Sequence, residues 1–453
     1  MTMKQAKDRH KMLTEAPIPQ LIVSLSIPTI ISMLVTGIYN SADTYFVGRI
    51  STQATAAVGL VFSVMAIIQA MGFFCGQGSG NYLSRLLGAG NSKKANEIAA
   101  TGFAMALVLG VLVAAAGNLF AENIADFIGA TDTARADTIA YMRIILLGAP
   151  FMMGQFVINN QLRFQGSAMY AMVGLLCGAI MNIGLDPLLM FGFGLGVRGA
   201  AMATVGGQMT SFIALLIGSS KGQNIRLDLR NVRFSFHNLF EISNGGMPSL
   251  IRQGMAAIAT LLLNRVSMTY GGDAAIAGMS IVTRVLMMLA SVLIGFGQGY
   301  QPVCSYNYGA GNYSRVKEGF FFCLKYGTLL MTIAGAVCFF PASAVVSWFR
   351  DDPEVVAIGA RALRWQAAAL PLLATSTLTN MMLQATGKGF QASITSSARN
   401  GIFFIPLIII LPRFFGLSGV VMTQAVADVL TILLCVPIVA RELKEMDRKA
   451  ASS

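Results

Sequence analysis

The chain has 453 residues, of which 55% are hydrophobic and only 11% are charged, and its mean hydropathy is +0.66. So few charged side chains cannot present a polar surface to water on all sides, which excludes a soluble globular protein. The formal net charge of +12 raises nucleic acid as a partner. The basic residues gather in alternate polar segments, however, and this distribution reports orientation in a membrane instead.

Twelve stretches of the chain hold the roughly 20 mostly apolar residues that a membrane-spanning helix requires. We expect spans over residues 17–41, 54–82, 95–117, 138–158, 168–189, 198–218, 240–268, 275–303, 319–341, 355–382, 393–412 and 418–440. No cleavable signal peptide is apparent, because the chain is polar through Glu15 and the apolar stretch that follows is too long for one.

Lysine and arginine occur before the first span and after the second, sixth, eighth and twelfth spans, whereas the loops after the third and ninth spans are acidic. This positive-inside pattern predicts that both termini lie in the cytoplasm, as an even number of spans requires. We expect a cytoplasmic tail, an amino-terminal lobe, a cytoplasmic linker, a carboxy-terminal lobe and a second cytoplasmic tail. Their expected bounds are 1–16, 17–218, 219–238, 239–440 and 441–453.

The two halves of the chain repeat one another. Gly-Gln-Gly at 76–78, with Gly-Ala-Gly-Asn at 88–91, recurs at 297–299 and 309–312, an offset of 221 residues. Further landmarks at nearly the same offset are the pairs Pro28 and Pro248, Asn159 and Asn380, and Gly199 and Gly419. Because six spans per half is an even number, the repeats enter the membrane in the same direction. This arrangement is typical of transporters that carry substrate between their repeats.

Ionisable side chains within the spans are few. Asp43 closes the first span, and Asn182 and Asp186 share one face of the fifth because they are four residues apart. A charged group at bilayer depth costs at least about 2.5 kcal/mol, so such residues usually serve function. Oxygen ligands of this kind suit a hard cation or a shared proton. The alternative is that both acids cap helices near the interface.

The sequence offers little to support an enzyme. Its only histidines, His10 and His237, lie outside the expected spans, and no Walker A motif is present. The six cysteines occur singly inside apolar stretches, so we expect packing roles for them.

Three runs of the sequence resemble the multidrug and toxic compound extrusion (MATE) family. These are Asp-Thr-Tyr-Phe-Val-Gly at 43–48, Arg-Phe-Gln-Gly at 163–166 and Asp-Pro-Leu-Leu at 186–189. The likeness covers essentially the whole chain and is nearest to bacterial drug exporters of Gram-positive cocci. It implies an all-α integral membrane protein with twelve transmembrane helices in two homologous six-helix lobes, which together form a V-shaped cavity.

The resemblance also implies a function. Family members are secondary active antiporters that export organic cations and other drugs in exchange for H⁺ or Na⁺, without a cofactor. We therefore expect small-molecule drugs and membrane lipid as partners, no nucleic acid, and a monomer in the bacterial cytoplasmic (inner) membrane. The alternative within the same superfamily is a lipid-linked oligosaccharide flippase, whose cavity is strongly basic and needs no coupling acid.

By resemblance, the coupling site for H⁺ or Na⁺ comprises Asp43, Asn182, Asp186 and Thr204, and the kink of the first span falls on Pro28. The candidate residues of the drug cavity are Tyr39, Tyr141, Asn159, Met33 and Arg252.

The seventh span departs from the family pattern. Many members carry an acid there after the proline, whereas this chain has Arg252. We therefore expect coupling to rest on the amino-terminal lobe. Arg252 is expected to pair with Asp428 or to extend toward the membrane surface.

Overall fold

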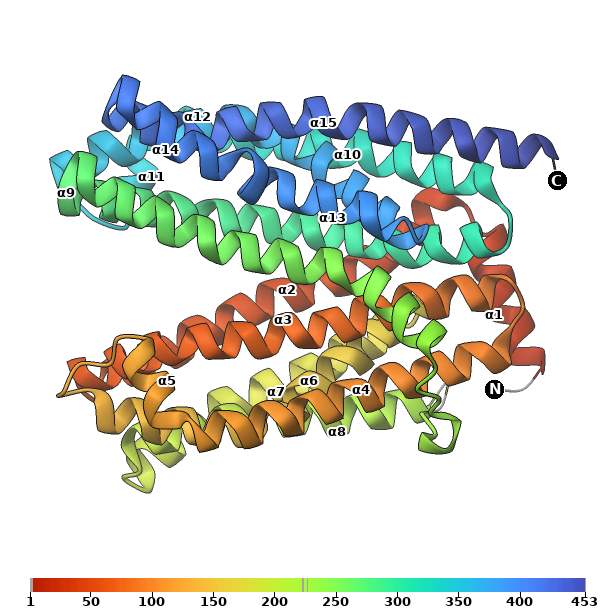
Figure 1. Cartoon of the computed structure of the whole chain (residues 1–453), viewed down its shortest axis with the longest axis horizontal. Helices are drawn as coiled ribbons and strands as arrows, with labels where there is room; N and C mark the ends of the chain where they lie inside the picture. The colour runs from red at the N-terminus through yellow and green to blue at the C-terminus, as the bar shows by residue number, and fades with distance from the viewer. Residues whose placement is uncertain (1–2, 222–223, 226, 453) are drawn as a thin grey trace. The chain divides into compact units, whose positions relative to one another are not determined.

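The computed structural model describes residues 3–221, 224–225 and 227–452, and this part of the chain is helical without any strand. The elements are labelled in Figure 1. They are α1 Met3–Glu15, α2 Ile18–Gly48, α3 Thr52–Gly88, α4 Ser92–Leu119, α5 Ala121–Phe127, α6 Arg135–Phe164, α7 Ala168–Pro187, η1 Leu188–Gly192, α8 Gly196–Ser220, η2 Leu229–Asn231, α9 Phe236–Gly309, α10 Tyr313–Phe339, α11 Ala342–Ser347, α12 Pro353–Ala385, α13 Gly389–Ser397, η3 Ala398–Ile402, α14 Phe404–Phe415 and α15 Leu417–Ser452.

Ten helices of the described chain are long and apolar enough to cross a membrane. One of them, α9, runs for 74 residues but has non-helical backbone at Gly272, with φ 60° and ψ −154°, so it consists of two helices in succession. A further helix, α12, has 33 residues and lies outside that set of ten, yet it is long enough to span. The expected all-α membrane fold with twelve long helices is confirmed.

By their internal contacts the helices form two compact units. The first comprises Met1–Ala16 and Ile27–Gly246, and the second comprises Pro17–Ser26 and Met247–Ser453. The first turns of α2 thus belong to the second unit, and the first turns of α9 belong to the first. Both changes of unit occur two residues or fewer before a proline, Pro28 in α2 and Pro248 in α9.

The repeated Gly-Gln-Gly motif lies where helices cross within each unit. Gly78 of α3 packs on the backbone of Ile242 in α9, and Gly299 of α9 packs on Ser26 in α2. A Cβ atom at either glycine would clash with the crossing helix, so only glycine permits this approach. Ser26 Oγ also donates a hydrogen bond of 3.0 Å to the carbonyl oxygen of Phe296. The motif is therefore architectural in both repeats.

The second repeated motif ends a helix. Gly90 follows α3 with φ 75°, and Gly311 follows α9 with φ 79°. This left-handed backbone is readily adopted by glycine alone, which explains its use at both positions. In the first repeat, Asn91 Oδ1 then caps α4 by accepting a hydrogen bond of 3.1 Å from the Lys94 backbone N–H.

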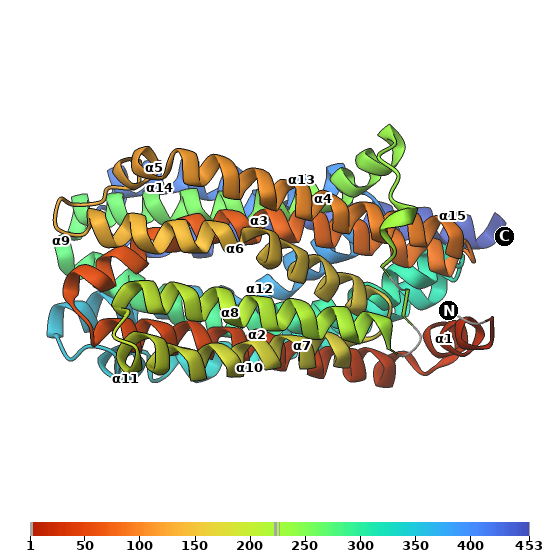
Figure 2. The same cartoon turned by 90° about the horizontal axis from the view of Figure 1, so that it is seen from below.

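Helix α6 lies at the centre of the first unit, where it contacts α3, α4 and α8 (Figures 1 and 2). Its Tyr141, Met142 and Ile145 side chains are fully buried. Helices in a bilayer associate mainly through van der Waals packing, which small residues favour. Gly110 of α4 illustrates this, because a Cβ there would lie 2.6 Å from the Cα of Pro150 in α6.

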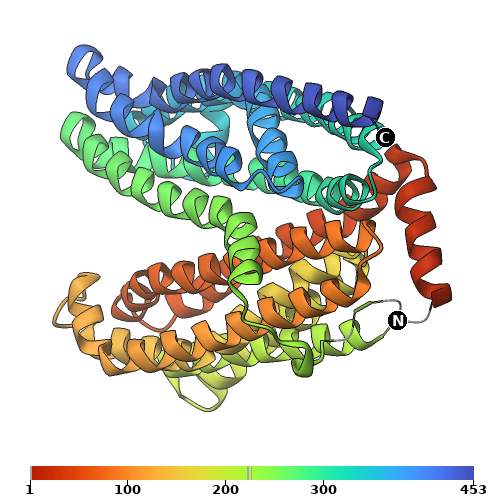
Figure 3. The same ribbon diagram turned by 45° about the vertical axis from the view of Figure 1, so that its right-hand side comes forward.

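In the second unit, α12 packs against α10 and α15. Helix α15 continues as one rod to the end of the chain, past the expected span end at residue 440, as its dark blue ribbon shows in Figure 3. Residues 441–449 of this extension hold seven charged side chains, so we take them to lie outside the membrane-spanning part.

Both units brace the turn after their fourth long helix in the same way. In the first unit, Ser167 Oγ donates a hydrogen bond of 2.6 Å to Asn224 Oδ1. In the second, Lys388 Nζ donates hydrogen bonds of 3.0 Å to both carboxylate oxygens of Glu445. Each partner of the second pair lies 221 residues after its counterpart in the first. The repeat therefore preserves the pairing but exchanges its chemistry.

Candidate functional site

Helix α7 places two of the predicted coupling residues. It ends at Pro187 and continues into the π-helical turn η1. Proline has no N–H group, so the α-helical hydrogen-bond ladder is interrupted directly after Asp186. Turns of the π type often occur at functional sites. Asp186 is fully buried, and Asn182, one turn earlier, is 3% exposed.

Several polar atoms of these residues lack a partner. Both carboxylate oxygens of Asp186, both polar side-chain atoms of Asn182 and Oδ1 of Asp43 are buried without a hydrogen bond to any side chain or backbone group of the described chain. Asp43 lies near the end of α2, within electrostatic range of Asp186. Buried polar groups are nearly always paired. A cluster of unpaired oxygens therefore fits a bound cation or proton.

Helix α8 brings Thr204 to the same region. Its hydroxyl donates a hydrogen bond of 3.0 Å to the Ala200 carbonyl oxygen, which leaves the oxygen lone pairs able to accept. Gly207 of α8 lies against α7 so closely that a Cβ would be 2.8 Å from the Asn182 Cβ. Carboxylate, amide and hydroxyl oxygens are suitable ligands for a hard cation such as Na⁺.

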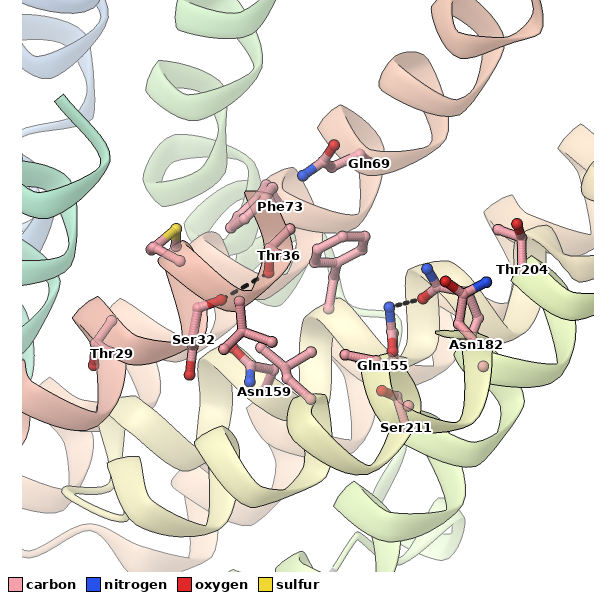
Figure 4. A pocket seen from close by; sticks show the side chains of 18 of the residues that line it. Thr29, Ser32, Thr36, Gln69, Phe73, Gln155, Asn159, Asn182, Thr204 and Ser211 are labelled. Atoms are coloured by element: carbon pink, nitrogen blue, oxygen red, sulfur yellow. Dashed lines mark hydrogen bonds between the residues drawn. The ribbon is translucent and has the colours of Figure 1, made fainter. Parts of the chain in front are cut away.

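Asn182 and Thr204 also line a cavity within the first unit, between α2, α3, α6, α7 and α8. The empty space between its walls is about 800 Å³, part of which is open to solvent. Figure 4 shows Asn182 and Thr204 toward one end of the cavity and Thr29 toward the other. The Asp43 and Asp186 carboxylates are not among the lining groups, so the cavity meets the acid pair only through their neighbours.

The cavity walls are mixed in character. Phe73 and Phe156 line one part, with ring centroids 5.0 Å apart and ring planes tilted by 37°. Gln155 donates a hydrogen bond to Gln208, marked by a dashed line in Figure 4. Such a mixture of aromatic surface with a few fixed polar groups is typical of small-molecule sites.

The predicted drug-cavity residues are distributed as follows. Met33 and Asn159 line the cavity. Tyr141 is fully buried in the hydrophobic core of the first unit and is not a lining residue. Arg252 is partly buried in α9, within the second unit. The side chain of Tyr39 lies outside the described residues.

Asn159 also has a structural contact. Its Nδ2 donates a hydrogen bond of 3.0 Å to the Ala171 carbonyl oxygen and so ties α6 to α7. The equivalent Asn380 donates to the Ala392 carbonyl oxygen at 2.7 Å. The repetition of this contact in both units explains why the asparagine recurs at the repeat offset.

Sequence analysis did not single out four polar residues of the cavity wall. They are Gln69, Gln155, Gln208 and Arg163. The three glutamines could have been found, because each is a polar side chain in the middle of an apolar span. Arg163 was visible only as part of a family motif.

The expected partner of Asp428 is wrong in the structure. Asp428 pairs with Arg399, whose Nε donates to Oδ1 at 2.7 Å and whose Nη2 donates to Oδ2 at 3.4 Å. Gln424 Nε2 adds a third hydrogen bond of 3.1 Å. Arg399 lies on η3, which faces α15 in this unit, whereas Arg252 lies on α9. The clearest buried acid of the second unit is therefore already neutralised.

Two repeated sets of membrane-length helices with a buried polar site define the class of multi-pass membrane transporters. The MatE family model matches residues 28–188 and 248–410, one segment in each repeat, and the chain belongs to this family.

Named relatives agree with this membership. The multidrug export protein MepA of Staphylococcus haemolyticus is 28% identical over 427 residues, which is 94% of each chain. A crystal structure of MATE in the bent conformation gives a TM-score of 0.92 at 25% identity, covering 98% of this chain and 99% of that one. A structure of MATE in the straight conformation gives a TM-score of 0.90, also at 25% identity, over 99% and 100%. The resemblance and the fold class predicted from the sequence are confirmed.

Proposed function

We propose that this protein is a secondary active multidrug efflux antiporter that exports organic cations and other drugs in exchange for H⁺ or Na⁺. One observation carries the proposal: the cluster of unpaired buried oxygens and the cavity share Asn182 and Thr204. Coupling requires that ion and cargo affect one another. Two residues that belong to both sites supply such a connection.

Binding of a cation at the acid pair would change the local charge. Asp43 and Asp186 repel one another when both are ionised, and a proton or Na⁺ removes that repulsion. Asp43 belongs to α2, which also supplies Thr29, Ser32 and Met33 to the cavity wall. A shift of α2 would therefore alter the cavity when the acid pair becomes occupied.

Pro28 provides the place where α2 can bend. It lies inside the helix, cannot donate to the preceding turn, and follows Ser26, the last α2 residue of the second unit. Solved relatives in bent and straight conformations support a bending step of this kind. One charge moving down a potential of about 100 mV releases about 2.3 kcal/mol. That energy supports a concentration ratio of roughly fiftyfold.

We further propose that the protein acts as a monomer in the bacterial cytoplasmic membrane with both termini inside. The lobes would comprise 17–218 and 239–440, joined by the linker 219–238. The positive-inside distribution of basic residues supports the orientation.

The test is export of an ethidium dye from proteoliposomes that hold an imposed cation gradient. Asp43→Asn and Asp186→Asn should each abolish gradient-driven export, while Asp132→Asn, in an exposed loop, should leave it unchanged. Removing sodium at fixed pH, and then the pH gradient at fixed sodium, identifies the coupling ion. Unchanged export by both acid variants would refute the mechanism.

The alternative, a lipid-linked oligosaccharide flippase, expects a strongly basic cavity. Only one of the residues that line this cavity, Arg163, carries a positive charge, which favours the drug exporter. A flippase would also show a defect in envelope polymers on gene deletion before any change in drug susceptibility.

A further inference from the structure

The cavity of the first unit contains a single formal charge. Of its lining residues, all within the described chain, only Arg163 is ionised at neutral pH, and none is acidic. Arg163 lies in the last turn of α6 and is 5% exposed. A cargo that entered the cavity would meet a guanidinium group and would find no carboxylate on the walls.

The guanidinium group is held by a neutral neighbour. Arg163 Nη2 donates a hydrogen bond to Asn160 Oδ1, one turn earlier on α6. A buried cation is costly unless a counter-charge compensates it. A guanidinium group presents five N–H donors in a planar fork that matches a carboxylate. The preferred counter-charge from a cargo is therefore a carboxylate.

The surroundings hold Arg163 in place. Gln165, two residues later, accepts hydrogen bonds from the Ile225 backbone N–H at 2.6 Å and from Arg9 Nη1 at 3.4 Å. The intervening Phe164 is fully buried against Gly80 of α3. Because the end of α6 is fixed on both sides, the guanidinium group is positioned before cargo arrives, which lowers the cost of binding.

The remaining walls indicate the body of the cargo. Phe73 and Phe156 form an aromatic surface, while Gln155 and Gln208 supply amide groups. An aromatic ligand can stack against the rings, and its amino groups can donate to amide oxygens.

From these observations we propose that the cavity selects planar aromatic zwitterions, and that Arg163 is the specificity-determining residue that binds their carboxylate. This inference rests on the proposed efflux function and refines its cargo. It assigns to Arg163 a role that a purely structural residue would not have, namely discrimination between an acid and its ester.

The test compares two dyes that differ only at the carboxylate: rhodamine B and its ethyl ester. Fluorescence anisotropy measures their binding to the full chain in lipid nanodiscs at fixed pH and salt. Arg163→Gln should weaken binding of the acid by about tenfold, equivalent to about 1.4 kcal/mol, and change binding of the ester less than about twofold. Arg163→Lys should retain part of the affinity for the acid.

A second variant leaves the arginine in place. Asn160→Asp sets a carboxylate beside the guanidinium group and so neutralises it, and the acid dye should again lose about tenfold in affinity. Unchanged binding of the ester shows that each variant is folded. Equal loss of both dyes, or no loss of the acid in either variant, would overturn the proposal.

Transport separates this inference from the proposed function. Gradient-driven export of the ester by wild-type protein, without selective binding of the acid, would uphold the exporter and refute the role of Arg163. Selective binding of the acid that depends on Arg163, without export of either dye, would uphold the site and refute the exporter.

Discussion

Arg399 and Asp428 form a two-point ion pair in the second unit, with Arg399 Nε 2.7 Å from Asp428 Oδ1. The Asp428 side chain is 7% exposed and that of Arg399 is 29% exposed. The pair joins η3 to α15, so it connects two helical segments that otherwise meet through apolar contacts.

Removing one partner of this pair should destabilise the protein. We expect Arg399→Leu to cost about 3 kcal/mol, because it leaves the buried Asp428 carboxylate without its counter-charge. The double variant Arg399→Leu with Asp428→Leu should recover most of the loss. Thermal unfolding in detergent provides the measurement, and single and double variants of equal stability would contradict this account.

The crossing at Gly78 predicts a packing defect. A Cβ at this position meets the Ile242 backbone, which cannot move aside as a flexible side chain could. Gly78→Ala should therefore destabilise the protein by about 1–3 kcal/mol. The control is Gly59→Ala on the same helix, where no atom lies within 4 Å of the added Cβ. That change should be neutral or slightly stabilising, and equal effects of the two substitutions would argue against a specific crossing.

Thr204 predicts a loss of coupling without a loss of folding. Thr204→Val removes the hydroxyl oxygen proposed to bind the cation, and dye export at limiting cation should fall by about tenfold. Thr210→Val is the matched control. Thr210 lies on the same helix and makes the same kind of bond, 2.9 Å to the Gly206 carbonyl oxygen, but does not line the cavity. Equal export by the two variants would remove Thr204 from the coupling site.

The extension of α15 predicts a dependence of stability on pH. Hydrogen bonds from Lys449 and then Lys388 lower the pKa of Glu445 from its ordinary 4.5 to about 2. The stabilisation is therefore complete above about pH 4.5 and is lost as the pH falls toward about 2. Because the Glu445 side chain is 37% exposed, its contribution should be less than about 1 kcal/mol.

Unfolding measured across this acidic range checks the prediction. Glu445→Gln should flatten the stability profile between about pH 4.5 and 2, whereas Lys444→Ala, an exposed neighbour, should leave it unchanged. A profile that keeps its slope without Glu445 would assign the dependence to other carboxylates.

Much of the fold could be predicted because hydropathy and repetition are properties of the sequence itself. Each expected span corresponds to one long helix or helix pair, and the glycines at 90 and 311 adopt the same left-handed backbone. The partner of Asp428 could not be predicted. Arg252 and Arg399 both interrupt apolar spans, and only the packing of η3 on α15 selects between them.

The same limit applies to the site. Asn182 and Asp186 could be grouped from their spacing on one helix, and Asp43 only through resemblance. Gln155 and Gln208 meet across two helices 53 residues apart in sequence, which no local pattern encodes. Tyr141 shows the converse, since a residue with a polar tip in a predicted cavity lies in the core.

The braces at Ser167 and Lys388 respond differently to ionic conditions. The pair between Ser167 and Asn224 is neutral, so dissolved salt leaves it almost unaffected. The attraction between Lys388 and Glu445 is electrostatic and partly open to solvent, and ions at about 1 M reduce its range to about 3 Å. A duplicated scaffold thus holds one half with a bond indifferent to its bath and the other with one that loosens as the medium becomes more saline.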